Sequence, residues 1–221
     1  DHGFQTFRRE VSLNNWLLES GYLTLKEAPL SESKARRLNE YVDWSKTRAY
    51  ALGLGGLYLN LKGREGAGIV DPKDADLLQD EIRLKFLASL DPKVGRPFGK
   101  GAYEVREIHQ GAHLDREPDM LLCFDAGWRV SWGTTGGGLS VVQGEGGEFL
   151  PGPVCSDNAK SWSGDHVSVD PSIVPCVFFC NRKVKLPAEG ASLLHVAPTV
   201  LALAGVPAPP ECDLAPLELA N

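Results

Sequence analysis

The 221-residue sequence predicts a soluble α/β domain in three layers, with helices on both faces of a largely parallel sheet. Segments with strand patterns alternate with segments that have helical patterns, which is typical of α/β folds. The runs 118–124 and 175–179 are apolar on both faces, as strands are when helices cover a parallel sheet on both sides. With 43% hydrophobic and 24% charged residues, the composition is that of a globular protein.

The N-terminal part of the chain carries helical and extended patterns in turn. Residues 11–20 have an apolar side and Gly21 stands where a C-cap glycine belongs, so they predict a short helix. Residues 48–61 predict two short strands that meet at a glycine turn. Residues 74–90 are apolar at three- and four-residue steps after Pro72, which predicts the clearest helix of the chain.

The C-terminal part continues this alternation. Residues 103–108 predict a strand, and the apolar runs 118–124 and 175–179 predict two buried strands. Residues 191–205 predict a helix that has Pro198 in its first turns, where a proline costs least.

The whole chain, residues 1–221, is expected to form one domain with a surface excursion over about residues 26–115, because no linker or internal repeat is visible. No apolar run approaches the roughly 18 residues that a membrane-spanning helix needs, so we expect no membrane span. No export signal is visible at the start, but the natural N-terminus is expected to be missing, so the localisation stays open.

The net charge limits the kinds of partner. A formal charge of -6 argues against a nucleic-acid duplex, because proteins that bind phosphate backbones gather Lys and Arg on one face. A small anionic ester remains a possible substrate if metal ions supply the local positive charge.

The five cysteines contain no Cys-x-x-Cys pair. Cys123 and Cys176 lie in apolar runs, which favours buried thiols that pack as small hydrophobic groups. A disulfide between Cys155 and Cys212 is left open, and with it the redox compartment.

Two other polar stretches have a functional and a structural interpretation. His109 and His113 have the four-residue spacing of helical zinc ligands, but Gly111 between them weakens a helix, so we assign them no metal. The segment 60–65 holds one glycine and two basic residues, too few for an anion-binding nest, and predicts a solvated turn.

Two short phrases carry the chemistry. The chain opens with Asp1, His2 and Gly3, in which the glycine lets the backbone fold tightly behind a carboxylate and an imidazole that face one cation. A second histidine, His166, closes the phrase Gly-Asp-His far along the chain. Carboxylates and imidazoles are ordinary zinc ligands.

The order of these phrases, with the segments 42–51 and 191–207, resembles the type I phosphodiesterase/nucleotide pyrophosphatase branch of the alkaline phosphatase superfamily. The resemblance runs nearly end to end, over the C-terminal half of such an enzyme. It implies an alkaline phosphatase-like fold and two divalent metal ions, usually zinc, which activate a nucleophile and stabilise the leaving oxygen of a phosphate ester.

The resemblance also implies roles for single residues. Asp1 and His2 match the ligands of the metal that touches the nucleophile, and His166 matches a ligand of the other metal. Asp165 either orients His166 from outside the ligand set or caps its turn; both roles stay open.

The chain departs from the family pattern in what it lacks. The nucleophilic Ser or Thr and an Asp-x-x-x-His pair precede the Asp-His-Gly phrase in the family, so we assign no catalytic residue to this chain. We therefore expect a hydrolase part that is inactive alone and needs the missing N-terminal half of its domain as a partner. A non-catalytic α/β module or degenerate family member is the alternative, and a sulfatase- or phosphoglycerate mutase-like enzyme is a further one.

Overall fold

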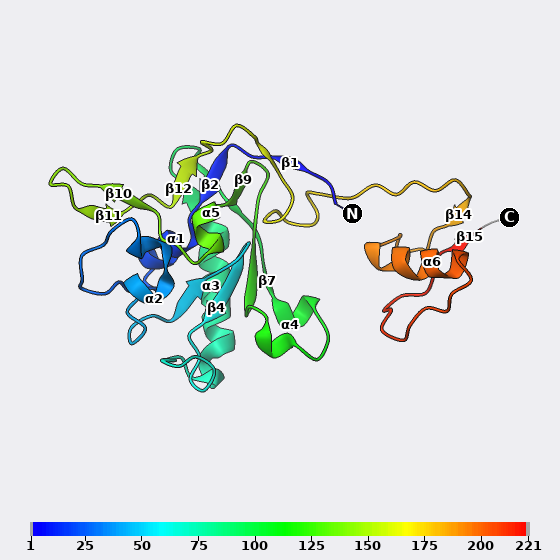
Figure 1. The fold of residues 1–221 in the computed structure, drawn as a ribbon, viewed down its shortest axis with the longest axis horizontal. Coiled ribbons are helices and arrows are strands. Elements are labelled where there is room, and N and C mark those ends of the chain that lie inside the picture. Colours follow the sequence, from blue (N-terminus) through cyan, green and yellow to red (C-terminus); the bar gives the residue numbers. More distant parts are fainter. Residues whose placement is uncertain (1, 220–221) are drawn as a thin grey trace. The chain divides into compact units, whose positions relative to one another are not determined.

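The computed structural model describes residues 2–219, which fall into two compact units (Figure 1). The large unit comprises Phe4–Val174, and the small unit comprises the chain from Pro175 onward together with the residues that precede Phe4.

A four-stranded antiparallel sheet forms the centre of the large unit. Its order is β3 (Ala49–Ala51), β4 (Gly56–Leu59), β8 (Met120–Phe124) and β7 (Gly99–Glu104). The predicted pair of strands at a glycine turn is confirmed as β3 and β4. Gly55 in that turn has φ +101°, and a Cβ there would lie 2.6 Å from the carbonyl oxygen of Leu122, so only glycine fits.

A second, three-stranded sheet places β2 (Arg9–Val11) between β12 (Cys155–Asp157) and β9 (Trp128–Val130). β2 runs antiparallel to β12 and parallel to β9. Three two-stranded antiparallel ladders complete the strands of this unit: β1 (Gln5–Thr6) with β13 (Gly164–Asp165), β5 (Leu90–Asp91) with β6 (Arg96–Pro97), and β10 (Val141–Gln143) with β11 (Phe149–Pro151).

The longest helix, α3 (Ala75–Ala88), confirms the prediction for residues 74–90. It follows a 3-10 turn at Pro72–Asp74, in which the Asp71 side chain accepts a hydrogen bond from the backbone N–H of Lys73. The helix packs against β7 and buries Ile82 and Phe86 completely.

The other helices of the large unit are short. The predicted helix at 11–20 is confirmed as α1, while the residues after Glu104, predicted as a strand, turn into α4 instead. These helices are α1 (Leu13–Glu19), α2 (Leu38–Tyr41), α4 (Val105–Ile108) and α5 (Trp132–Thr135), with 3-10 turns at Lys34–Arg36 and Leu114–Arg116.

The hydrophobic core of the large unit lies between α1, α3 and the four-stranded sheet. Three phenylalanine rings pack at its centre, with ring centroids 5.6 Å apart between Phe86 and Phe98 and between Phe86 and Phe124. Edge-to-face contacts of this kind add about 0.5–1.5 kcal/mol per pair beyond the burial of the rings.

The predicted three-layer fold with a largely parallel sheet is wrong. The strands are short and form small, mainly antiparallel sheets; among the named strands of residues 2–219, only β2 and β9 pair in parallel. The apolar run 118–124 does contain a strand, β8, but helices of the described chain do not cover it on both faces. Its burial alternates: Met120, Leu122 and Phe124 are buried, whereas Leu121 and Cys123 are half-buried on the other face.

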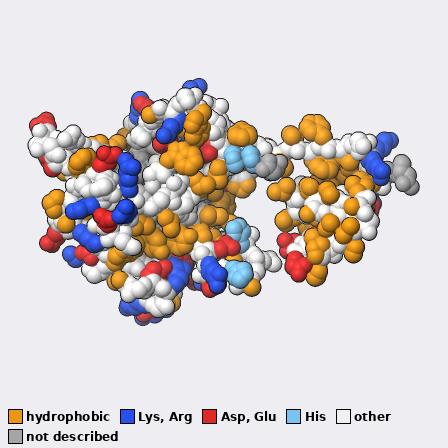
Figure 2. All heavy atoms as spheres, viewed as in Figure 1, with side chains coloured by type: hydrophobic (Ala, Val, Ile, Leu, Met, Phe, Trp, Pro, Cys, Tyr) orange, Lys and Arg blue, Asp and Glu red, His pale blue; other side chains and the backbone are white. Residues whose placement is uncertain are grey.

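The small unit contains β14 (Val184–Lys185) paired antiparallel with β15 (Glu218–Leu219), a 3-10 turn at Leu193–His195, and α6 (Val196–Leu203). The predicted helix at 191–205 is present but shorter. The strand predicted at 175–179 is wrong, since these residues have no regular structure and Phe179 is 88% exposed. Hydrophobic side chains cover much of the visible face of this unit (Figure 2).

No helix in the described part of the chain is long and apolar enough to cross a membrane.

Candidate metal centre

The predicted ligands Asp1, His2 and His166 divide between the two units and the undescribed terminus. Asp1 lies outside the described residues. His2 belongs to the small unit, where its Nδ1 lies 3.2 Å from the carbonyl oxygen of Gly3, and His166 belongs to the large unit. Their role as ligands of one two-metal site remains a prediction.

A short ladder connects the chain just after Asp-His-Gly with the chain just before His166. β1 and β13 pair antiparallel, with Gln5 opposite Asp165 and Thr6 opposite Gly164. The ring of Phe4 then packs edge-to-face on the His166 imidazole, with centroids 5.2 Å apart. Phe4, which follows the first phrase, is thus in direct contact with the histidine of the second phrase, 162 positions further along the chain.

Asp165 is buried, with 4% of its surface exposed. Its Oδ2 accepts a hydrogen bond from the Ser168 hydroxyl at 2.8 Å and lies 3.7 Å from Nε of Arg129. The Ser168 hydroxyl oxygen accepts in turn from the backbone N–H of Val130 in β9. The hydrogen bond between Asp165 and Ser168 closes the turn that contains His166. An orienting role of Asp165 on the His166 imidazole stays a prediction.

Arg129 and Ser168 are the residues that sequence reasoning missed. Arg129 is 1% exposed, and its guanidinium lies between the rings of Phe7, Trp132 and Trp162, with Cζ 4.6 to 5.2 Å from the ring centroids. The sequence carries only a weak signal for this cluster, because the arginine and the tryptophans are scattered over 34 positions from Arg129 to Trp162 and Phe7 is far upstream.

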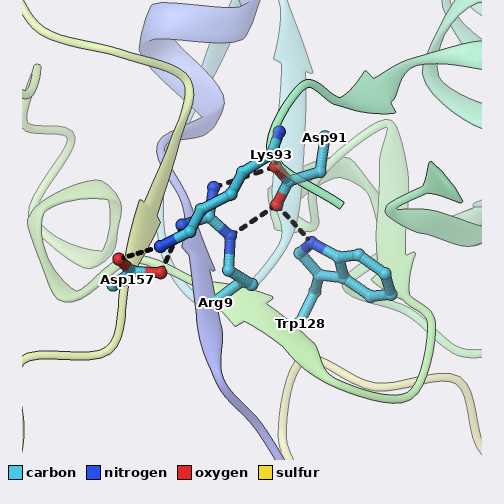
Figure 3. A network of polar contacts seen from close by, with 5 residues as sticks. All are labelled: Arg9, Asp91, Lys93, Trp128 and Asp157. Atoms are coloured by element: carbon cyan, nitrogen blue, oxygen red, sulfur yellow. Dashed lines mark hydrogen bonds and ion pairs between the residues drawn. The ribbon is translucent and has the colours of Figure 1, made fainter. Parts of the chain in front are cut away.

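A second buried ion pair joins Arg9 and Asp91 (Figure 3). It lies on the face of the three-stranded β12–β2–β9 sheet opposite to Arg129. Arg9 donates two hydrogen bonds to the Asp91 carboxylate, at 2.6 and 2.9 Å, and one to Asp157 at 2.7 Å. Trp128 Nε1 and the backbone N–H of Lys93 also donate to Asp91. Although burial opposes ionisation, these donors hold the pKa of Asp91 well below its usual range. The network joins β2, β5, β9 and β12.

The polar stretches assigned no function have structural partners. Arg64 forms a two-point ion pair with Asp119, at 2.8 and 2.6 Å, and donates to the backbone carbonyl of Leu59. His109, at the end of α4, pairs with Glu117. Arg64 therefore has a carboxylate partner of its own, which agrees with a structural turn.

The cysteines are all free thiols. Burial raises the pKa of Cys123 and of Cys155 to about 12, so both thiols stay protonated at neutral pH and are poor nucleophiles. Cys176 is exposed, so its predicted burial is wrong.

No group of three or more His, Cys, Asp or Glu side chains that could hold a metal ion lies within residues 2–219. The expected ligand set includes Asp1, which falls outside this range. The donor types themselves, one carboxylate and two imidazoles, suit zinc.

Comparison with protein-family models, curated proteins and solved structures finds no match to this chain.

Proposed function

We propose that this chain is the C-terminal part of a metal-dependent hydrolase that acts on phosphodiesters, pyrophosphates or related phosphate esters. The observation that carries the proposal is the β1–β13 ladder, because it packs Phe4, two residues after His2, directly on His166. The proposal draws its chemistry from the resemblance of the two phrases to the phosphodiesterase branch.

Asp1 and His2 would hold the metal beside the nucleophile, and His166 would help to hold the other. Bound zinc would supply Lewis-acid chemistry, by polarising the phosphoryl oxygens and stabilising the leaving oxygen. The residues of this chain would position the metal ligand His166. The β1–β13 ladder and the hydrogen bond between Ser168 and Asp165 hold the backbone on both sides of its imidazole. The nucleophile and the remaining ligands would come from an N-terminal half.

The first test joins this chain to an N-terminal half that supplies those groups and measures hydrolysis of an aryl phosphodiester. We expect His166→Ala to lower kcat/KM by on the order of 100-fold or more, as when a group that stabilises transition-state charge is removed. His113→Ala is the matched control, because His113 is an exposed histidine of the same unit, and it should leave the rate unchanged. Full activity in His166→Ala would refute the proposed function.

Calorimetry separates the enzyme from a non-catalytic module. In the same joined protein, replacing Asp1 and His2 together by alanine should abolish one of the zinc-binding events. Zinc binding that is unchanged in this double variant, or missing in the parent protein, would favour the module.

A further inference from the structure

The surroundings of Arg129 are unusual for a buried cation. Taking a guanidinium out of water costs several kcal/mol unless opposite charge and hydrogen bonds compensate it. Within the described residues, its Nε and Nη1 atoms are buried and make no hydrogen bond. The compensation comes instead from three aromatic ring faces, from the carboxylate of Asp165, 3.7 Å from Nε, and from the carboxylate of Glu10, which lies opposite Arg129 in β2 and attracts its charge.

The aromatic rings hold the guanidinium in one place. Trp132 and Trp162 contact each other edge-to-face with centroids 6.2 Å apart, and Phe7 packs on Trp162 at 5.3 Å. A planar guanidinium stacks between such rings, whereas an ammonium group is compact and strongly hydrated. The site therefore selects arginine by shape as well as by charge.

Arg129 acts on the segment that carries His166. The carboxylate of Asp165 faces Arg129, and its Oδ2 also accepts the Ser168 hydroxyl hydrogen. Ser168 is fastened to β9 through the N–H of Val130, next to Arg129 in the chain. His166 lies between these two fastened residues, and Phe4 packs on its ring. Asp165 and Ser168, the two ends of the turn, thus both contact residues of β9.

We propose that Arg129, acting through Asp165 and Ser168, is the positioning residue that holds the His166 imidazole in place for metal binding. The inference rests on the proposed function only for the statement that His166 binds zinc. The fixed position of the ring is a property of the large unit and is measurable without metal.

The test compares the same conservative substitution at two buried arginines. Arg129→Lys keeps the charge but loses the stacked plane, and Arg9→Lys makes the equal change on the other face of the sheet, at the Asp91 pair. Ser168→Ala is the milder second variant, which removes one hydroxyl and keeps the test available if Arg129→Lys does not fold. The readouts are ring-to-ring nuclear Overhauser cross-peaks between Phe4 and His166 in the 221-residue chain, and zinc affinity in the protein joined to its N-terminal half.

We expect Arg129→Lys and Ser168→Ala to weaken the Phe4–His166 cross-peaks and to lower zinc affinity by about 10-fold, the lower end of the loss on removing groups that orient a ligand. Arg9→Lys should lower stability and leave both readouts as in the parent. Unchanged cross-peaks and affinity in the two test variants would overturn the inference, as would an equal loss in Arg9→Lys.

A failure of the proposed function gives a different result. If the joined parent protein binds no zinc, the cross-peaks alone decide: their loss in the two test variants supports positioning by Arg129, and their retention overturns it.

Discussion

Two buried arginines in adjacent strands of one small sheet compensate their charges in different ways. Arg9 in β2 makes three hydrogen bonds to carboxylates, two of them to the fully buried Asp91. Arg129 in β9 has aromatic faces and one carboxylate at 3.7 Å. Because Arg9 lies opposite Trp128 and Glu10 lies opposite Arg129, and neighbouring residues in a strand face opposite ways, the two arginines occupy opposite faces.

At the residue scale, Asp91→Asn should destabilise the protein by about 3–5 kcal/mol at pH 7, because it leaves the buried Arg9 charge with only the exposed carboxylate of Asp157. The folded-state pKa of Asp91 lies below the unfolded value of about 3.9. The ionised Asp91 therefore contributes fully to folding stability above that pH, and this contribution is lost as the pH falls from there through the folded-state pKa. Urea unfolding at pH 7 and pH 3 should therefore show a large gap between parent and variant at pH 7 and a smaller one at pH 3.

The control for this prediction is Glu32→Gln, which removes an exposed i,i+4 pair with Arg36 and should cost less than about 1 kcal/mol. A gap between parent and Asp91→Asn that is the same at both pH values would contradict the ionised-pair interpretation.

At the scale of elements, α3 shows how one helix divides its apolar residues between the core and water. Ile82 and Phe86 are fully buried, whereas Leu77 and Leu84 are exposed. The helix therefore stabilises the large unit through one face, which packs against β7 and the phenylalanine cluster. The exposed leucines add helix propensity and little else.

Ile82→Ala should lower the free energy of unfolding by about 2–5 kcal/mol, since it removes buried methyl groups and leaves a cavity. Leu84→Ala, two positions away in the same helix, should change it by less than about 0.5 kcal/mol, because Leu84 is 71% exposed. Equilibrium urea unfolding of both variants checks the pair. Similar losses at the two positions would show that the packing face of α3 is assigned wrongly.

At the scale of the whole molecule, the core cluster lies entirely between Val11 and Cys155, inside the large unit. The small unit buries few side chains, among them His195, Thr199 and Leu217, while Val200 and Leu203 of α6 are exposed. A unit with its own core can fold alone, and a short one that buries little apolar surface is only marginally stable.

A chain that ends at Val174 should therefore keep the near-ultraviolet circular dichroism of its tryptophans and unfold in one cooperative transition. The separate segment from Pro175 onward should show little helical dichroism in water. Loss of the tryptophan signal in the shortened chain would contradict the division into a self-sufficient large unit and a dependent small one.

The sequence by itself determined the local elements whose causes lie within a few residues. The helix α3 followed from apolar spacing after Pro72, and the β3–β4 hairpin followed from glycines that alone tolerate positive φ. The candidate ligands Asp1, His2 and His166 came from short phrases and a family resemblance, and their joint role remains a proposal.

Only the tertiary structure decided how the strands pair and which polar groups are buried. An apolar run such as Met120–Phe124 fits a parallel or an antiparallel sheet, and its direction depends on distant partners. Likewise, Arg9 pairs with Asp91, which lies 82 positions further along the sequence, and Arg129 contacts Asp165, which lies 36 positions further along. Such contacts gain their energy from burial and charge compensation, which exist only once the chain has brought distant segments together.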